Sequence, residues 1–380
     1  MIYFDNAATT YIKPESVINA VVNNLKNGGN SGRGGHLAAL EANRIIYNAR
    51  KTVSDFFGFE SPESIVFTSS ATESLNIALQ GVLKNNDHVI TTCMEHNSVL
   101  RPLFLMEERG VEVSFVTCNE CGELEYQQME KLVKSNTRMI VATHGSNVTG
   151  NLNDIILLSQ FAKEKGLIFL LDASQTAGEF KIDVDKMNID ILCTTGHKGL
   201  MGPQGVGLLG VKKEIYIRPF KVGGTGILSF SKEQPDTMPT RLEAGTLNMP
   251  GIAGLTAAIE FINAIGLEKI SERQKTLMDT FYKGVRDLGG VKIYGGFECH
   301  NRAPIVSLNI GDINSSQIAD ILSTDYNIAT RAGAHCAPLL HKHFKTEKQG
   351  MVRFSFGYFN TLLEVEEAIK AVKEIAELAI

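Results

Sequence analysis

The sequence lacks any long hydrophobic run and any strong excess of charge. No apolar segment approaches the roughly 20 residues that a membrane-spanning helix needs, and no apolar stretch follows a basic start near Met1. The net charge of −5 gives no reason to expect binding to nucleic acid or to an anionic membrane surface. We therefore expect a cytoplasmic protein with no nucleic-acid partner and no membrane partner.

Cysteine is also scarce, and a chain of 380 residues builds enough core to fold without disulfides, so we expect six free thiols, at positions 93, 118, 121, 193, 299 and 336. Cys118 and Cys121 have the spacing of a redox or zinc pair, but no second pair accompanies them, which favours a polar hairpin turn. His341 and His343 beside Cys336 suggest a metal site as an alternative. The local charge pattern favours a reactive thiol there, and we expect no metal.

From Ile65 onward, patterns typical of strands and helices alternate. Strands are expected at 65–67, 88–92, 111–116, 139–143, 167–171, 191–195 and 206–209, and helices near 99–108, 126–134 and 154–165. This succession predicts a mostly parallel sheet covered by helices on both faces. Further helices, strands and a final helix opened by a capping box at 361–364 predict a smaller α/β domain. We place the large domain at 15–255 and the smaller one at 1–14 and 256–380.

Two helices are expected before the first of these strands. Pro14 introduces one whose apolar face holds Val17, Ile18, Val21, Val22 and Leu25. The second is longer, and its predicted buried side holds Leu37, Leu40, Ile45, Ala49, Val53 and Phe56. Residues 27–36 between them form a glycine-rich loop, and its Arg33 and His36 leave a linker and a ligand contact equally open.

Lys198 lies in a glycine-rich turn between the strands expected at 191–195 and 206–209. Such a place suits an amine that meets a ligand at a strand end, because lysine forms Schiff bases with carbonyls and pyridoxal phosphate is the commonest cofactor held that way. From this turn alone, a surface lysine is an equally good interpretation. Asp172 ends another apolar strand and favours the cofactor, since pyridoxal enzymes place an acid beside the pyridine nitrogen.

Small hydroxyl residues at 68–72 lead into a predicted helix. The first turn of a helix offers unpaired N–H groups and the positive end of the helix dipole, and phosphate binds readily there. Simple capping of the helix is the alternative, and the residues themselves do not separate the two.

Four motifs together make the chain recognisable: Thr195-Gly-His-Lys198, Asp172-Ala-Ser-Gln175, Glu95-His96-Asn97 and Arg331-Ala-Gly-Ala-His-Cys336. They resemble the class-V aminotransferase family, specifically its cysteine desulfurase branch of the group II, selenocysteine lyase-like type. The similarity runs from Tyr3 to Arg353. It implies a pyridoxal-phosphate-dependent transferase of fold type I, with a mostly parallel seven-stranded sheet and a smaller C-terminal α/β domain.

The resemblance also assigns residues to the site. For the cofactor it implies Ala71, Thr72, His96, Asn147, Asp172, Gln175, Thr195, His197 and Lys198, with Gly245 and Thr246 capping the phosphate of the partner in a homodimer. For the substrate it implies Arg353, which would hold the α-carboxylate, with Arg331, Asn147 and Ala8. The catalytic residues would be Lys198, Cys336 and His96.

The reaction implied is the conversion of L-cysteine to L-alanine. Lys198 would take the α-proton, and the thiolate of Cys336 would attack the substrate sulfur and keep it as a persulfide. His96 would help to shuttle the proton. Cys336 follows a basic residue in a turn, where we expect its thiolate to be stabilised and exposed. The short chain between Cys336 and Arg353 favours transfer of the sulfur to a dedicated acceptor protein.

Other functions remain open from the sequence. A selenocysteine lyase or another cyst(e)ine C–S lyase would have the same fold, and a lyase that eliminates directly would not depend on Cys336. An aminotransferase would need a ketoacid. A catalytically silent relative that serves as an interaction scaffold is disfavoured, because Lys198, Asp172, His96 and Arg353 are all present.

Overall fold

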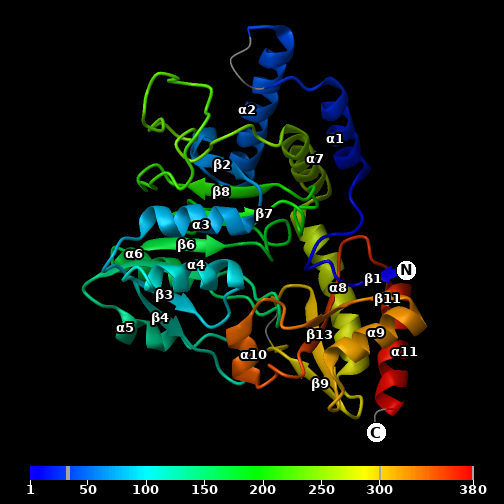
Figure 1. The fold of residues 1–380 in the computed structure, drawn as a ribbon. Coiled ribbons are helices and arrows are strands. Elements are labelled where there is room, and N and C mark those ends of the chain that lie inside the picture. Colours follow the sequence, from blue (N-terminus) through cyan, green and yellow to red (C-terminus); the bar gives the residue numbers. More distant parts are fainter. Residues whose placement is uncertain (31–34, 299–300, 379–380) are drawn as a thin grey trace.

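The computed structural model describes residues 1–30, 35–298 and 301–378, and its largest sheet has seven strands (Figure 1). Their order is β2 (Ile65–Thr68), β8 (Gly207–Val211), β7 (Ile191–Thr195), β6 (Ile168–Asp172), β5 (Thr137–Thr143), β3 (His88–Thr92) and β4 (Glu112–Val116). Only β8 runs against its neighbours β2 and β7, while the pairs from β7 to β4 are parallel. The predicted mostly parallel sheet is confirmed.

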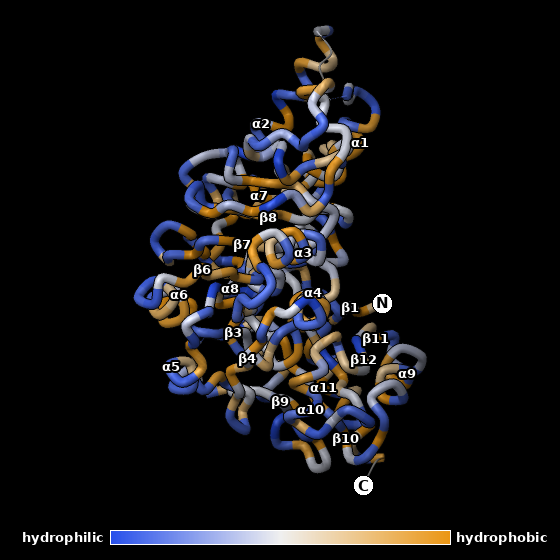
Figure 2. Tube along the Cα trace, turned by 60° about the vertical axis from the view of Figure 1, so that its left-hand side comes forward, coloured by the Kyte–Doolittle hydropathy of each residue, from blue (hydrophilic) through white to orange (hydrophobic). Residues whose placement is uncertain are grey.

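Helices cover both faces of this sheet. On one face lie α3 (Ala71–Val82) and α4 (Asn97–Glu107), and on the other α2 (Leu37–Phe57), α6 (Ile155–Glu164) and α7 (Met249–Ile265). Side chains of consecutive strand residues point to opposite faces of the sheet. Phe169 packs in the core with α2, α6 and α7, whereas Leu170 packs in the core with α3 and α4. A strand buried on both sides needs a continuous apolar run, and the strands at the centre of the sheet are largely hydrophobic (Figure 2).

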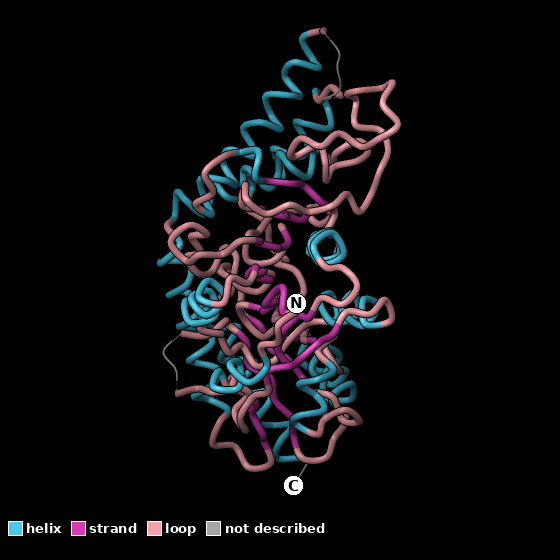
Figure 3. Tube along the Cα trace, turned by 90° about the vertical axis from the view of Figure 1, so that its left-hand side faces the viewer, coloured by secondary structure: helices cyan, strands magenta, loops and turns pink. Residues whose placement is uncertain are grey.

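The connections are less regular than expected. The helix predicted at 126–134 is a 3₁₀ turn at Tyr126–Gln128 followed by the short α5 (Met129–Leu132), so that prediction was too long. A second 3₁₀ turn, Pro62–Ser64, leads into β2. Residues 212–248, between β8 and α7, contain neither helix nor strand (Figure 3).

The rest of the chain forms a smaller α/β unit. Its antiparallel sheet has the order β12 (Arg331–Gly333), β13 (Met351–Ser355), β10 (Ile305–Ile310) and β9 (Val291–Tyr294). Its helices are α8 (Leu267–Val285), α9 (Ser315–Tyr326), α10 (Pro338–Phe344) and α11 (Leu362–Leu378). The predicted capping box is present: Thr361 Oγ1 accepts the Glu364 N–H at 3.2 Å, and the Glu364 carboxylate accepts the Thr361 N–H at 2.8 Å.

The N-terminus belongs spatially to this smaller unit. Strand β1 (Ile2–Tyr3) pairs in parallel with β11 (Ile328–Ala329), and Phe4 is buried among residues of α8, β13 and α11. Figure 1 shows the N-terminus beside β11, while α1 (Glu15–Asn27) lies against α7. The boundaries expected after residues 14 and 255 stay a prediction.

The predicted buried face of α2 is confirmed at Ala49 and Val53 and was wrong at Leu37 and Leu40. Its buried stripe contains Ala42, Ile46, Ala49, Val53 and Phe57, whereas Leu37 and Leu40 are 86% and 47% exposed. The small alanines allow α2 to approach α7 closely, which turns the large leucines outward. In α1, Val17 is buried, but Ile18, Val22 and Leu25 are exposed. Together Ile18, Val22, Leu25, Leu37 and Leu40 form the α1/α2 surface. Arg33 and Cys299 lie outside the described residues.

The segment from Cys118 to Glu123 is the predicted hairpin turn. Asn119 Oδ1 accepts the N–H groups of Cys121 and Glu123, both at 3.0 Å. Within the described ranges, no three His, Cys, Asp or Glu side chains are grouped as metal ligands would be. In the same ranges no single helix has the length and apolar character to cross a bilayer, and only the pair α7 and α8, bent by 84°, passes that test jointly.

Candidate active site

A pocket of about 110 Å³ opens at the carboxyl ends of β5, β6 and β7, beside the start of α3. Strand ends are where ligands bind in open parallel sheets. Its lining consists of Ser70, Ala71, Thr72, His96, Ser98, Thr143, Gly145, Asn147, Asp172, Ser174, Gln175, Thr195, His197 and Lys198. The structure therefore brings together every expected cofactor residue except Gly245 and Thr246. The small polar residues that sequence reasoning missed lie beside or near these motifs in the chain.

Lys198 follows β7 and is half-buried. Burial, together with the charge of Arg353, lowers the pKa of its amine to about 8, against the opposing effect of Asp172. The N-terminal segment fixes its backbone, because the Thr10 hydroxyl donates to the Lys198 carbonyl at 2.7 Å and Lys13 Nζ to the His197 carbonyl at 2.9 Å. Lys198 is thus an amine with a fixed backbone and a reduced affinity for its proton.

Asp172 ends β6 directly beside β7, where it pairs with Cys193 in the sheet. Its side chain is buried, and Oδ1 accepts hydrogen bonds from the backbone and the hydroxyl of Ser174. Burial raises the pKa of this carboxyl, whereas Ser174 and the Lys198 charge lower it. A buried carboxylate of this kind is stabilised by a cationic partner in the pocket.

His96 caps the start of α4. Its Nδ1 accepts the Ser98 N–H at 3.0 Å and lies 2.8 Å from the Ser98 hydroxyl. Burial lowers the pKa of the ring to about 4, and Lys198 and Arg353 act in the same direction. The imidazole is therefore neutral near pH 7 with its proton on Nε2, so it enters the chemistry as a donor.

The pocket has the groups needed by a ligand with a phosphate at one end and a ring nitrogen at the other. The first turn of α3 presents unpaired N–H groups at Ala71 and Thr72, with the positive end of the helix dipole. Thr195 Oγ1 and His197 Nδ1 are buried, and neither has a hydrogen-bond partner among the described residues. Buried polar atoms without partners are costly, so a bound polar group would satisfy them. Asp172 supplies the acid for a ring nitrogen.

Gly245 and Thr246 do not reach this pocket within one chain. They line a separate hollow of about 560 Å³ beside α2. Glu243 anchors their segment by an ion pair with Arg50 at 2.6 Å and by accepting the Phe67 N–H at 2.8 Å. Their predicted role requires a second copy of the chain and stays a prediction.

Two arginines approach the pocket from the smaller sheet. Arg353 on β13 lies directly opposite Arg331 on β12. Arg353 Nη1 donates to the Asn147 carbonyl at 2.9 Å, and its Nη2 pairs with Asp5 Oδ1 at 2.7 Å. The Ala8 N–H donates to the Asp5 carbonyl at 3.0 Å. Sequence reasoning missed Asp5, although it lies in the N-terminal stretch that carries the resemblance.

Cys336 is exposed in a turn that two hydrogen bonds tie to the pocket. Its carbonyl accepts the Asn97 N–H at 2.7 Å, and the His335 carbonyl accepts Asn147 Nδ2 at 2.7 Å. Both residues of the turn have left-handed backbones, with φ of 50° at His335 and 57° at Cys336. The turn thus carries backbone strain, which is common at functional sites.

The expected exposure of Cys336 is confirmed, but the expected cationic neighbour at His335 is not found. Burial, together with the charge of Arg353, lowers the pKa of His335 to about 3. His335 is therefore neutral near pH 7 and gives the Cys336 thiolate no cationic neighbour. The sequence shows a basic residue beside the cysteine but does not show that its ring is buried.

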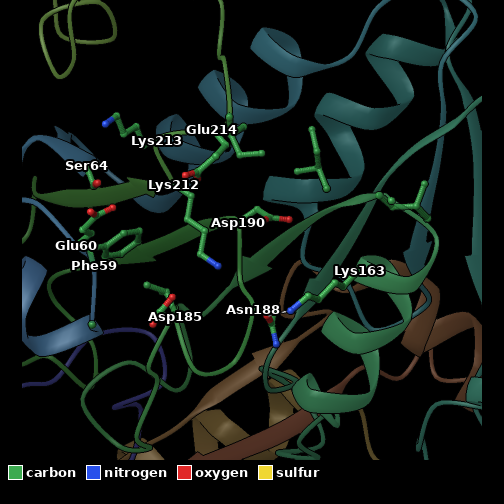
Figure 4. A pocket seen from close by; sticks show the side chains of 16 residues that line it. Phe59, Glu60, Ser64, Lys163, Asp185, Asn188, Asp190, Lys212, Lys213 and Glu214 are labelled. Carbon is green, nitrogen blue, oxygen red and sulfur yellow. Dashed lines mark hydrogen bonds between the residues drawn. The ribbon is translucent and has the colours of Figure 1, made fainter.

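A larger hollow of about 840 Å³ lies elsewhere, where β6 begins. Charges of both signs line it, including Lys163, Lys212, Asp185 and Asp190 (Figure 4). It contains none of the predicted site residues and lies at the edge of the sheet opposite the carboxyl ends. The smaller pocket therefore remains the candidate active site.

Comparison with known proteins agrees with this arrangement. Residues 2–368 match the family model for class-V aminotransferases. A probable cysteine desulfurase of Methanothermobacter thermautotrophicus is 33% identical, over 99% of this chain and 94% of the relative. One of Pyrococcus abyssi is 34% identical over the same shares.

Solved structures give the same result. An apo cysteine desulfurase from Thermococcus onnurineus superposes with a TM-score of 0.92 at 35% identity, covering 99% of this chain and 94% of the other. A cysteine desulfurase of Escherichia coli, solved as its S-sulfonic acid form, has a TM-score of 0.88 at 27% identity, with 100% and 95% covered. This chain belongs to the class-V aminotransferase family.

Proposed function

We propose that the protein is a pyridoxal-phosphate-dependent cysteine desulfurase, which converts L-cysteine to L-alanine and holds the sulfur as a persulfide on Cys336. The observation that carries this proposal is the anchoring of the exposed Cys336 turn, through Asn97 and Asn147, to the pocket that contains Lys198 and Asp172. The relatives described above are named as cysteine desulfurases, in agreement with this assignment.

The residues present fit pyridoxal phosphate. Ala71 and Thr72 would hold the phosphate, Asp172 the pyridine nitrogen and His96 one face of the ring, while Lys198 would form the Schiff base. The bound cofactor supplies an electron sink for the carbon from which the α-proton is removed. We infer that Asn147, Gln175, Thr195 and His197 complete its surroundings.

Lys198 is the residue suited to take the α-proton. The pKa of its amine, at about 8, lets a sizeable neutral fraction exist near pH 7. Arg353 donates to the carbonyl of Asn147, a residue that lines the pocket, so its guanidinium lies beside the site where we propose that it binds the substrate carboxylate together with Arg331.

Cys336 carries out the sulfur step. Its thiolate forms a new S–S bond with the substrate sulfur, and the C–S bond of the substrate breaks with its electron pair kept by the carbon. That carbon then takes up a proton, so cysteine and a thiol give alanine and a persulfide without an outside oxidant. Neutral His96, with its proton on Nε2, is placed to act as a donor during this step.

We also propose a homodimer. The α1/α2 surface and exposed side chains of the 212–248 passage, including Phe230 and Val222, leave a large apolar area uncovered in a single chain. A second copy would cover it and would bring Gly245 and Thr246 to the partner's phosphate. Light scattering after gel filtration would give twice the chain mass, and a mass of one chain would contradict the proposal.

A sulfur-acceptor protein and a cytoplasmic setting complete the proposal. The Cys336 turn is short, and Asn97 and Asn147 tie its backbone to the pocket, so Cys336 has little reach away from it. An acceptor therefore has to come to Cys336. Full turnover without any acceptor, and no stimulation when one is added, would count against this part.

The experiment is an assay of the holoenzyme with L-cysteine, measuring alanine and pyruvate. We expect alanine from the wild type and none from Cys336→Ala. Cys121→Ala is the matched control, because this thiol is also exposed but lies in the hairpin turn away from the pocket. Pyruvate, or turnover that persists in Cys336→Ala, would indicate a C–S lyase, and a ketoacid requirement would indicate an aminotransferase.

A further inference from the structure

Two arginines lie side by side on the smaller sheet, one of them bonded to Asn147 of the pocket, and one carboxylate lies between them. Arg331 and Arg353 are direct cross-strand neighbours on β12 and β13, a position in which like charges repel. Asp5 binds Arg353 Nη2 at 2.7 Å, and its other oxygen lies 4.0 Å from Arg331 Nη1. The three side chains together carry one net positive charge.

We propose that Asp5 sets the charge selectivity of the substrate site, so that the site accepts an amino acid with one carboxylate and disfavours one with a second acidic group. This proposal rests on the proposed function, in which Arg353 and Arg331 bind the α-carboxylate. With Asp5 present, a single substrate carboxylate neutralises the arginine pair. A second anion in the same site finds no net positive charge left, and Asp5 repels it.

Asp5 is not needed to hold Arg353 in place. Arg353 Nη1 is fixed separately by the Asn147 carbonyl at 2.9 Å, and the side chain is only 3% exposed on its strand. Its Nε is buried and has no partner among the described residues, so the Asn147 bond and the burial of the side chain hold the guanidinium. Loss of the Asp5 charge therefore leaves the guanidinium where it is and makes the site more positive.

The backbone around Asp5 is also held without its carboxylate. The Ala7 N–H donates to Ser355 Oγ at 2.9 Å, Asn6 Nδ2 donates to the Ser355 carbonyl at 3.0 Å, and Phe4 is fully buried. A change from Asp5 to Asn keeps the size of the side chain and these contacts. We expect Asp5→Asn to fold as the wild type does.

The test is calorimetric titration of the holoenzyme with two unreactive probes, propionate with one carboxylate and succinate with two. In Asp5→Asn we expect succinate to bind at least about tenfold more tightly than in the wild type, because a unit charge near the site is removed. Propionate gains less, so the ratio of succinate to propionate affinity rises. Asp5→Glu, which restores the charge, keeps the wild-type ratio.

Asp183→Asn is the matched control. Its side chain is 15% exposed, against 18% for Asp5, and it also pairs with a cation, Lys186, but it lies on the loop between β6 and β7. An unchanged or weaker succinate affinity in Asp5→Asn, or an equal gain in Asp183→Asn, would overturn the proposal.

Kinetics with L-cysteine separate this inference from the proposed function. Because cysteine carries an ammonium group as well as a carboxylate, we expect its KM to change less in Asp5→Asn than the affinity for succinate. A wild type that does not turn over L-cysteine, together with the expected succinate gain, would contradict the proposed function and leave the selectivity in place. Normal turnover without the succinate gain would contradict the selectivity alone.

Discussion

The floor and the rim of the pocket are built in different ways. The floor comes from the ends of two paired strands of the large sheet, where Asp172 lies at the end of β6 and Lys198 just beyond β7. The rim joins Asp5, Arg353 and Cys336, and the first two are 348 residues apart in the sequence. Local strand-and-turn patterns determine the floor, whereas the rim exists only when the N-terminal segment meets the smaller sheet.

Their electrostatics differ in the same way. On the floor, burial shifts the proton affinities of Lys198 and Asp172, each toward its neutral form. On the rim, burial lowers the pKa of Arg353, but Asp5 opposes that shift and pairs with its charge at 2.7 Å. The floor is therefore suited to proton transfer, and the rim to holding a charged group in place.

The largest expected effect comes from the floor. Lys198→Ala removes the amine that we propose as the acceptor of the α-proton and as the group that would hold the cofactor, so we expect kcat for alanine formation to fall at least about a thousandfold. Lys186→Ala removes an exposed lysine that pairs with Asp183 and should leave kcat unchanged. Substantial turnover by Lys198→Ala would contradict the assignment of proton transfer to the floor of the pocket.

A change on the rim should act on KM more than on kcat. Arg353→Lys keeps the charge but loses the planar fork for a carboxylate, so KM for L-cysteine rises by about 50-fold with a smaller change in kcat. Steady-state kinetics measure both values. An equal loss in kcat with KM unchanged would show that Arg353 acts on the chemistry itself.

The neighbouring arginine should matter less. Arg331 is 48% exposed and its charge is screened by water and salt, so Arg331→Lys raises KM by only about threefold. The two arginines lie opposite each other on paired strands, and the same substitution compares them directly. A larger effect at Arg331 than at Arg353 would reverse the assignment of the main carboxylate ligand.

Behind the floor, a buried carboxyl should affect stability and its pH dependence. Burial raises the pKa of Glu179 to about 8 from 4.5, and Glu179 Oε2 has no partner among the described residues. The folded state therefore favours the protonated carboxyl of Glu179. Its contribution to the free energy of unfolding is fully present below pH 4.5 and is lost as the pH rises to about 8.

Glu179→Gln removes this dependence. We measure the difference in Tm between Glu179→Gln and the wild type. We expect this difference to favour the variant by at least about 2 °C more at alkaline pH than near pH 4.5. His144 provides the opposite case, because burial lowers the pKa of its ring from 6.5 to about 3. The stability that the neutral ring contributes to the wild type is therefore lost as the pH falls from 6.5 toward 3. His144→Gln should therefore gain stability at acid pH. Thermal melts of both variants across pH measure this, and parallel curves for wild type and Glu179→Gln would contradict it.

The floor was largely predictable from the sequence, and the rim was not. The strand expected at 88–92 is β3 as found, and Asp172, Thr195 and Lys198 were expected at strand ends where they lie. Short-range patterns suffice there, because each strand is buried on both faces and has to be apolar throughout.

The errors share a different cause. The contact of Asp5 with Arg353, the burial of neutral His335 and the outward turn of Leu37 and Leu40 all depend on which distant segment packs against them. Periodicity gives an apolar face of a helix but does not show which of two apolar stripes meets a neighbour. The exposed stripe on α2 is part of the surface that we assign to a second copy.

The most direct test of the central claim is to react the holoenzyme with one equivalent of sulfur-labelled L-cysteine, without reductant or acceptor, and to locate the label by peptide mass spectrometry. We expect one labelled sulfur as a persulfide on Cys336, with one alanine released, and no label on the exposed Cys121. Alanine release with the label free in solution, or on another cysteine while Cys336 stays unmodified, would contradict it.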